Sequence, residues 1–189
     1  MIRPRIYQYL QINRPTYVPS VPWVPTRIDV IDRVLSIANL TDDDIFCDLG
    51  CGDGRVVIKA AKEYNVKCLC IEKREDLVQK AIANVKKAGV EDLVKVIHAD
   101  FFEVPLRDVT VVYMYLLTSV NRLLRPKLER ELKIGTRVIT LDFEIPGWSP
   151  VYVEGHGGWQ GTIYLYIKGI SDIESISEIS NLYLPLRRI

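Results

Sequence analysis

The sequence predicts an α/β fold: a mostly parallel, seven-stranded sheet with helices on both faces and an antiparallel hairpin at one edge. Short apolar runs typical of strands alternate with amphipathic segments typical of helices through the first three quarters of the chain. This alternation favours parallel strands joined by crossover helices. The last two apolar runs are separated only by a glycine-rich turn, which favours an antiparallel pair.

The elements follow in order along the chain. The strands are expected over residues 45–49, 66–72, 93–100, 109–116, 136–143, 150–156 and 161–168, and the helices over 26–38, 55–64, 75–88 and 118–132. Thr26 resembles an N-cap because apolar residues recur at helical spacing after it. The helix over 75–88 should turn Ile82 inward with its other apolar residues, and Gly89 should end it.

The chain has 189 residues, enough for one domain with a sizeable core. We expect a proline- and aromatic-rich segment over 1–25 that packs on the domain, a main domain over 26–169 and a C-terminal extension over 170–189. No apolar run approaches the ~18 residues of a membrane span, and a signal peptide is not evident. A cytoplasmic protein is therefore expected, with a monomer favoured. The net charge of +1 indicates no clear nucleic-acid face.

Four cysteines lie close together, at Cys47, Cys51, Cys68 and Cys70. Their spacing matches no common zinc pattern and no histidine is near, so no metal site is expected. The simplest interpretation is that they are small apolar core residues on two strands. A disulfide between neighbouring strands is the alternative.

The stretch DLGCGDGR, residues 48–55, joins the first strand to the next helix. Gly50, Gly52 and Gly54 leave the backbone open to a ligand and permit positive φ. In such folds ligands bind at the carboxyl ends of the strands. The spacing differs from the G-x-G-x-x-G dinucleotide fingerprint because Arg55 holds the position of its last glycine. A P-loop would end in Gly-Lys-Ser/Thr, which is absent.

This loop resembles motif I of the class I, Rossmann-like S-adenosylmethionine-dependent methyltransferases. The resemblance implies that Asp48 fixes the loop and approaches the methionine amino group. It also implies that Glu72, at the end of the second strand, accepts hydrogen bonds from the ribose, and that Asp100 and Phe101 hold the adenine. Tyr113 and Tyr115, which alternate on the fourth strand, VTVVYMYL, would surround the transferred methyl group.

A second resemblance concerns the methyl acceptor. The segment VPWVPT, residues 21–26, and the motifs RPKLExEL at 125–132 and DFxIPGW at 142–148 are similar to those of compact non-SET protein lysine methyltransferases. That group includes archaeal enzymes and the ATP-synthase c-subunit methylase. It implies S-adenosylmethionine as cofactor and protein substrates presenting lysine. Thr26 would contact the methionine carboxylate, and Trp23 stands where the family usually has tyrosine.

An aromatic channel of Trp23, Tyr113, Tyr115 and a further candidate, Trp148, would suit a lysine stem with a polar tip. Two other functions stay open. One is the same methyl transfer to RNA or a small metabolite. The other is a non-catalytic cofactor-binding module that regulates a partner.

Overall fold

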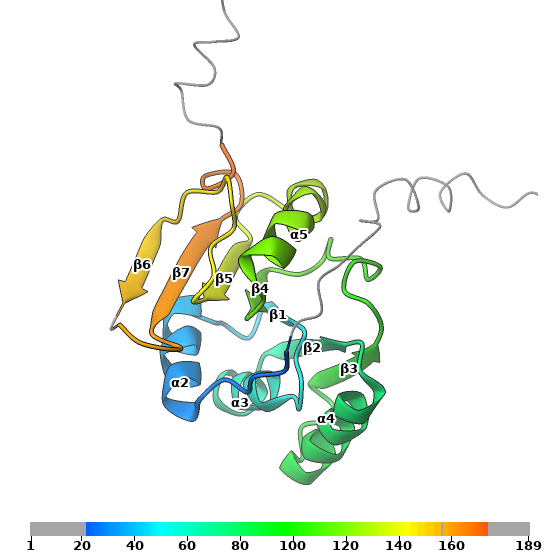
Figure 1. Ribbon diagram of the computed structural model, residues 1–189. Coiled ribbons are helices and arrows are strands. Elements are labelled where there is room, and N and C mark those ends of the chain that lie inside the picture. Colours follow the sequence, from blue (N-terminus) through cyan, green and yellow to red (C-terminus); the bar gives the residue numbers. More distant parts are fainter. Residues whose placement is uncertain (1–21, 156, 174–189) are drawn as a thin grey trace, which may run out of the picture.

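The computed structural model describes residues 22–155 and 157–173, whose seven strands form one sheet in the order β3-β2-β1-β4-β5-β7-β6 (Figure 1). The strands are β1 (Ile45–Leu49), β2 (Lys67–Glu72), β3 (Val94–His98), β4 (Val111–Met114), β5 (Arg137–Leu141), β6 (Tyr152–Gly155) and β7 (Thr162–Ile167). The helices are α2 (Ile28–Ala38), α3 (Arg55–Tyr64), α4 (Glu75–Ala88) and α5 (Thr118–Glu131).

The strand pairing confirms the predicted mixed sheet. Neighbours from β3 to β5 run parallel, whereas β7 pairs antiparallel with both β5 and β6. The carboxyl ends of the five parallel strands, β1 to β5, therefore lie side by side at one end of the sheet, together with the start of β7. We call this the carboxyl end of the sheet. It holds most of the site residues that the sequence analysis predicted.

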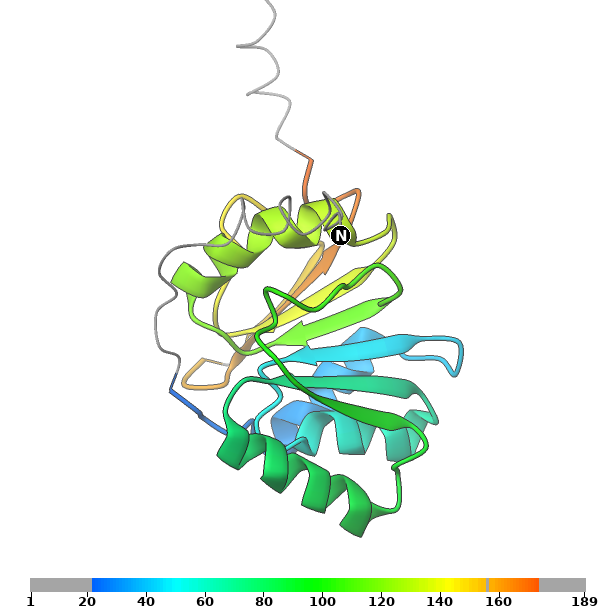
Figure 2. The same ribbon diagram turned by 90° about the vertical axis from the view of Figure 1, so that its right-hand side faces the viewer.

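Helices cover both faces of the sheet, as predicted (Figure 2). Side chains alternate along a strand, so Phe46 and Val111 join the apolar cluster that packs under α2, α3 and α4. Their neighbours Cys47 and Val112 join the cluster on the other face, which α5 covers. Each face therefore has its own buried core.

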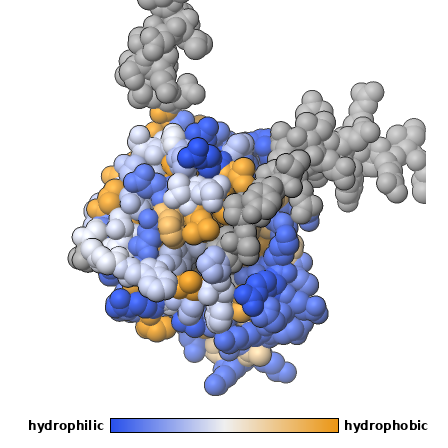
Figure 3. Space-filling model, in the orientation of Figure 1, coloured by the Kyte–Doolittle hydropathy of each residue, from blue (hydrophilic) through white to orange (hydrophobic). Residues whose placement is uncertain are grey.

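One predicted core residue is wrong. Ile82 keeps 46% of its surface exposed, although it lies on the helix that buries Leu77, Val78, Ala81 and Val85. The helix α4 packs near β3, at the end of the sheet, so its buried stripe is narrow. The surface over α4 is largely hydrophilic in the space-filling view, while apolar patches are scattered over the rest of that face (Figure 3).

Most of the predicted segment 1–25 and of the extension 170–189 lies outside the described residues. Pro22 to Pro25 are described, and they lie against the domain where they line a cavity. Across 22–155 and 157–173 no helix has the length and apolar character needed to cross a membrane.

Candidate active site

A cavity of about 380 Å³ lies at the carboxyl end of the sheet, and the segment 22–26 bounds it on one side. It brings together the predicted site residues from five parts of the chain. Those that line it are Trp23, Thr26, Asp48, Gly50, Glu72, Asp100, Phe101, Tyr113 and Tyr115. Gly52, Gly54 and Trp148 are the predicted residues that do not line it.

The loop between β1 and α3 is bound to the end of β2. The amides of Gly50 and Cys51 both donate to the carbonyl oxygen of Ile71, at 2.9 and 3.1 Å. The amide of Gly52 donates to Glu72 Oε2 at 3.0 Å. The loop therefore takes its shape from the strand that carries Glu72, and the two parts of the predicted cofactor site form one unit.

Gly52 and Gly54 are needed for different reasons. At Gly52, where φ is 56°, a Cβ atom would lie 2.4 Å from Nε1 of Trp23. At Gly54, the N-cap of α3, a Cβ atom would find ordinary contact 3.4 Å from Cβ of Ala81, but the backbone has a φ of 80°, which favours glycine. Gly52 therefore lets the segment 22–26 close over the loop, and Gly54 lets the backbone turn into α3.

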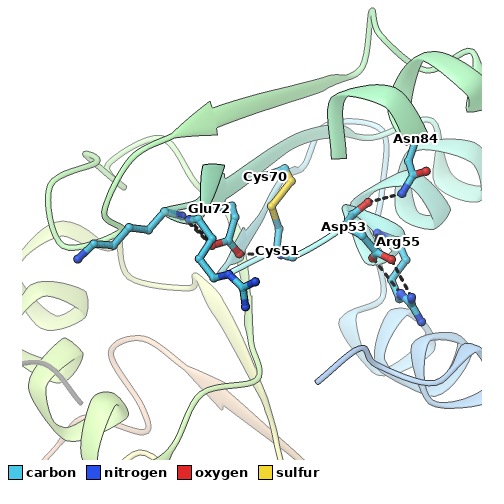
Figure 4. Close-up of a disulfide and its surroundings, with 9 residues drawn as sticks. Cys51, Asp53, Arg55, Cys70, Glu72 and Asn84 are labelled. Atoms are coloured by element: carbon cyan, nitrogen blue, oxygen red, sulfur yellow. Dashed lines mark hydrogen bonds and ion pairs between the residues drawn. A yellow bond between two sulfur atoms is a disulfide. The ribbon is translucent and has the colours of Figure 1, made fainter. Parts of the chain in front are cut away.

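Glu72 is buried and its carboxylate is already well supplied with donors. Oε1 accepts the amides of Lys73 and Arg74, both at 2.8 Å, and Oε2 accepts that of Gly52 (Figure 4). A carboxylate has about four acceptor positions. One position, on Oε2, is left for a ligand hydroxyl, so a single ribose hydroxyl fits better than two.

Asp48 is a buried carboxyl group that faces the cavity. Burial raises its pKa well above the usual value, and the neighbouring charges of Glu72 and Asp53 raise it further. A buried charge needs a partner of opposite sign. A cationic ligand group beside Asp48 would supply that partner and would restore the carboxylate.

Asp100 and Phe101 line the cavity beyond β3, as predicted. Oδ1 of Asp100 accepts the amide of Phe102 at 3.1 Å, and Oδ2 accepts Nζ of Lys73 at 3.0 Å. Phe101 packs on the core beside Phe102, with ring centroids 5.0 Å apart. These contacts present an acceptor group and an aromatic surface to the same cavity, which suits a planar base with an amino group.

We call residues 22–27 the strap. Thr26 does not cap α2: the N-cap is Arg27, which makes no side-chain cap hydrogen bond. The Thr26 hydroxyl instead pairs with the hydroxyl of Tyr113 at 3.0 Å, inside the protein. Lys80 places its ammonium 4.7 Å from the ring centroid of Trp23. The strap is thus fixed to β4 at one point and covered by α4 at another.

Three residues that the sequence analysis missed complete the other side of the site. Nε1 of Trp159 donates to the hydroxyl of Tyr115 at 2.5 Å, and that hydroxyl donates to Oδ2 of Asp142 at 3.3 Å. The side chain of Gln160 accepts the amide of Arg27 at 2.7 Å and donates to the carbonyl of Pro25 at 3.0 Å. The turn between β6 and β7 therefore holds both Tyr115 and the strap.

Trp148 lies elsewhere, so its predicted place in the aromatic channel is wrong. It is buried on the α5 face of the sheet, edge-on to Tyr166, and its Nε1 donates to Glu129 at 3.1 Å. Asn121 and Arg125 on the same helix donate to backbone carbonyls of the segment 143–146. The two motifs over 125–132 and 142–148 therefore bind each other.

The cysteines divide into two pairs. Cys51 and Cys70 form a disulfide between the loop and β2, so the simpler prediction of four core thiols is wrong for this pair (Figure 4). Cys51 lies in the loop and lines the cavity, so the bond joins a loop to a strand. Cys47 and Cys68 are free and buried, and burial raises the pKa of both thiols, to about 12 for Cys68.

Comparisons with known proteins agree with this geometry. Residues 48–152 match the family model of the ANTKMT methyltransferase domain. A protein-lysine N-methyltransferase of Saccharolobus islandicus is 49% identical over 82% of this chain and 98% of its own length. An adenine nucleotide translocase lysine N-methyltransferase of Mus musculus is 35% identical over 73% of this chain, which spans 60% of that protein.

A solved structure extends the likeness to the fold. The crystal structure of an RNA methyltransferase from Salinibacter ruber in complex with S-adenosyl-L-homocysteine has a TM-score of 0.74 and 43% sequence identity. The match covers 76% of this chain and 93% of that one. The residues that match the family model, 48–152, include the cavity-lining residues of β1, β2, β4 and the loops that follow them. The chain belongs to the ANTKMT methyltransferase domain family.

Proposed function

We propose that this protein transfers methyl groups from S-adenosylmethionine to lysine side-chain amines of other proteins. The observation that carries the proposal is the 49% identity to a protein-lysine N-methyltransferase across 98% of that relative. Two further relatives named as lysine N-methyltransferases, of mouse and human, are 35% and 31% identical.

The residues of the cavity fit this cofactor. Asp48 offers a buried carboxyl group to an ammonium, Glu72 offers one acceptor position to a hydroxyl, and Phe101 offers a ring beside the Asp100 carboxylate. The Salinibacter ruber relative holds S-adenosyl-L-homocysteine, the product of the same cofactor. When bound, S-adenosylmethionine supplies a methyl group on a cationic sulfur.

The aromatic residues of the site act by position. Burial raises the pKa of Tyr113 far above its usual value, and burial also raises that of Tyr115. Both phenols therefore stay protonated at neutral pH, and neither serves as a general base. The amine must lose its proton before transfer, and burial beside a cation lowers a lysine pKa. We infer that the protein desolvates and orients the amine.

Methyl transfer to RNA remains the second candidate, because the 43% identical structure is named an RNA methyltransferase. The near-neutral charge of this chain, +1, weighs against it. A cytoplasmic location and a monomeric state stay predictions, and gel filtration tests the second.

Radiolabelled methyl transfer from S-adenosylmethionine to whole-cell protein extract tests the proposal. Parallel samples are treated with RNase or protease, and the labelled products are hydrolysed to amino acids. We expect protease-sensitive label recovered as methyl-lysine. Label lost with RNase would favour the second candidate. Tight cofactor binding without any label would favour a small-molecule acceptor or the non-catalytic module.

A further inference from the structure

The turn over residues 157–161 carries a tryptophan, Trp159, that is exposed to solvent beside the cavity. Trp159 is 70% exposed, yet its Nε1 atom is bonded to the hydroxyl of Tyr115, which lines the cavity. The indole therefore lies just outside the cavity, on the side of β4 and β5. The same part of the site holds Phe143, whose ring stacks on Tyr115 with centroids 6.0 Å apart.

The turn is held in one shape by two polar side chains. The carboxylate of Asp142, a residue with φ of 59°, accepts the amides of Gln160, Gly161 and Thr162 at 2.7 to 3.2 Å. The buried side chain of Gln160 then binds the backbone of the strap. A rigid aromatic residue loses little conformational entropy when a partner covers it.

We propose that Trp159 binds the polypeptide that carries the target lysine, beside the point where the lysine enters the cavity. The inference rests on the proposed function and adds a specificity-determining residue to it. The lysine stem lies along Tyr115, and a flanking part of the acceptor chain covers the exposed indole. Large exposed aromatic residues are frequent energetic centres of protein interfaces.

The charges nearby favour a polypeptide over a nucleic acid. The carboxylates of Asp142 and the exposed Glu144 follow β5, next to Phe143 and Tyr115. They repel the phosphates of an RNA strand that stacked a base on Trp159. They attract the cationic side chain of an incoming lysine.

The test compares Trp159→Ala and Trp159→Phe with the wild type on a pool of synthetic 11-residue peptides, each with a central lysine and varied flanks. We expect Trp159→Ala to raise the KM for the pool about tenfold. Its kcat and its affinity for S-adenosylhomocysteine should stay within about twofold of wild type. Trp159→Phe keeps an aromatic ring but loses the hydrogen bond to Tyr115. Its KM should therefore lie close to the wild-type value. Ile134→Ala serves as the control. It removes another exposed apolar side chain, which precedes the amino-terminal end of β5, at the end of the sheet away from the cavity.

Four results would overturn the inference. An unchanged KM in Trp159→Ala would show that the acceptor does not touch the indole. A KM that stays equally high in Trp159→Phe would assign the effect to the lost hydrogen bond. Tighter binding of a single-stranded RNA pool to wild type than to Trp159→Ala, with no labelled peptide, would make the partner RNA. Wild-type protein that labels no peptide but does bind S-adenosylhomocysteine would remove the proposed function, and the inference with it.

Discussion

The disulfide between Cys51 and Cys70 should contribute strongly to stability. It closes a loop with a sequence separation of 19 residues. In the chain-entropy account a loop of this length restricts the unfolded state by about 3 kcal/mol at 25 °C. For a chain of this size that corresponds to a lowering of Tm by roughly 6–12 °C when the bond is removed.

The perturbation is the double variant Cys51→Ala, Cys70→Ala, followed by urea unfolding and calorimetry with and without reductant. Reduced wild type should match the double variant, and the variant should not respond to reductant. The control is Cys47→Ala, a buried free cysteine whose loss creates a small cavity but leaves the response to reductant intact.

Affinity for S-adenosylhomocysteine gives the second half of this test. Three backbone amides still bind the loop to β2 after reduction, so the affinity should change less than about threefold. A stability loss below about 1 kcal/mol would refute the entropic reasoning. A collapse of affinity at unchanged stability would show that the bond shapes the folded loop instead of restricting the unfolded chain.

Three further predictions concern the cavity and the strap. In Asp48→Asn, Tm at pH 7 should rise, because the folded pKa of Asp48 lies above the unfolded value of ~3.9 and the carboxyl group therefore costs stability as pH rises from the unfolded towards the folded pKa. Affinity for S-adenosylhomocysteine should fall, and calorimetry and a binding titration measure the two effects. Gln160→Ala removes two hydrogen bonds to the strap, of about 0.5–1.5 kcal/mol each. The affinity for S-adenosylhomocysteine should therefore fall roughly tenfold, and the amide of Arg27 should exchange its hydrogen faster. The control Gln79→Ala, at an exposed residue, should change neither quantity. Gly52→Ala drives a Cβ against Trp23, so the strap should exchange faster and bind the ligand more weakly; wild-type affinity would contradict the packing argument.

Local sequence patterns were enough to predict the helices and strands and the residues proposed to bind the cofactor. The helices over 55–64 and 75–88 have the predicted bounds, because glycines and polar turns mark their ends. Asp48, Glu72 and Asp100 were assigned through the resemblance to methyltransferase motifs, and they meet because the carboxyl ends of parallel strands lie at the same end of a sheet. Their assigned ligand contacts stay predictions.

The residues that the sequence analysis missed act through contacts between distant parts of the chain. Gln160 binds backbone atoms more than 130 residues away, and Trp159 binds Tyr115 across 44 positions. No local period encodes such pairs. Thr26 was misplaced for a related reason, since its hydroxyl finds Tyr113 instead of the backbone of α2. A weak signal was present in the glycines around Trp159, which indicate a turn with an unusual backbone.

The contacts of α5 restrict the number of residues that this helix can contain. Asn121, Arg125 and Glu129 succeed one another at four-residue intervals on one side of the helix, and each binds the segment over 143–148. One residue inserted between Asn121 and Arg125 would rotate the two later side chains by about 100° and separate them from that segment. Phe143, held by Asn121 against Tyr115, would then lose the support of the chain that follows it. This helix should therefore tolerate many exchanges of residue type on its exposed side but neither insertion nor deletion.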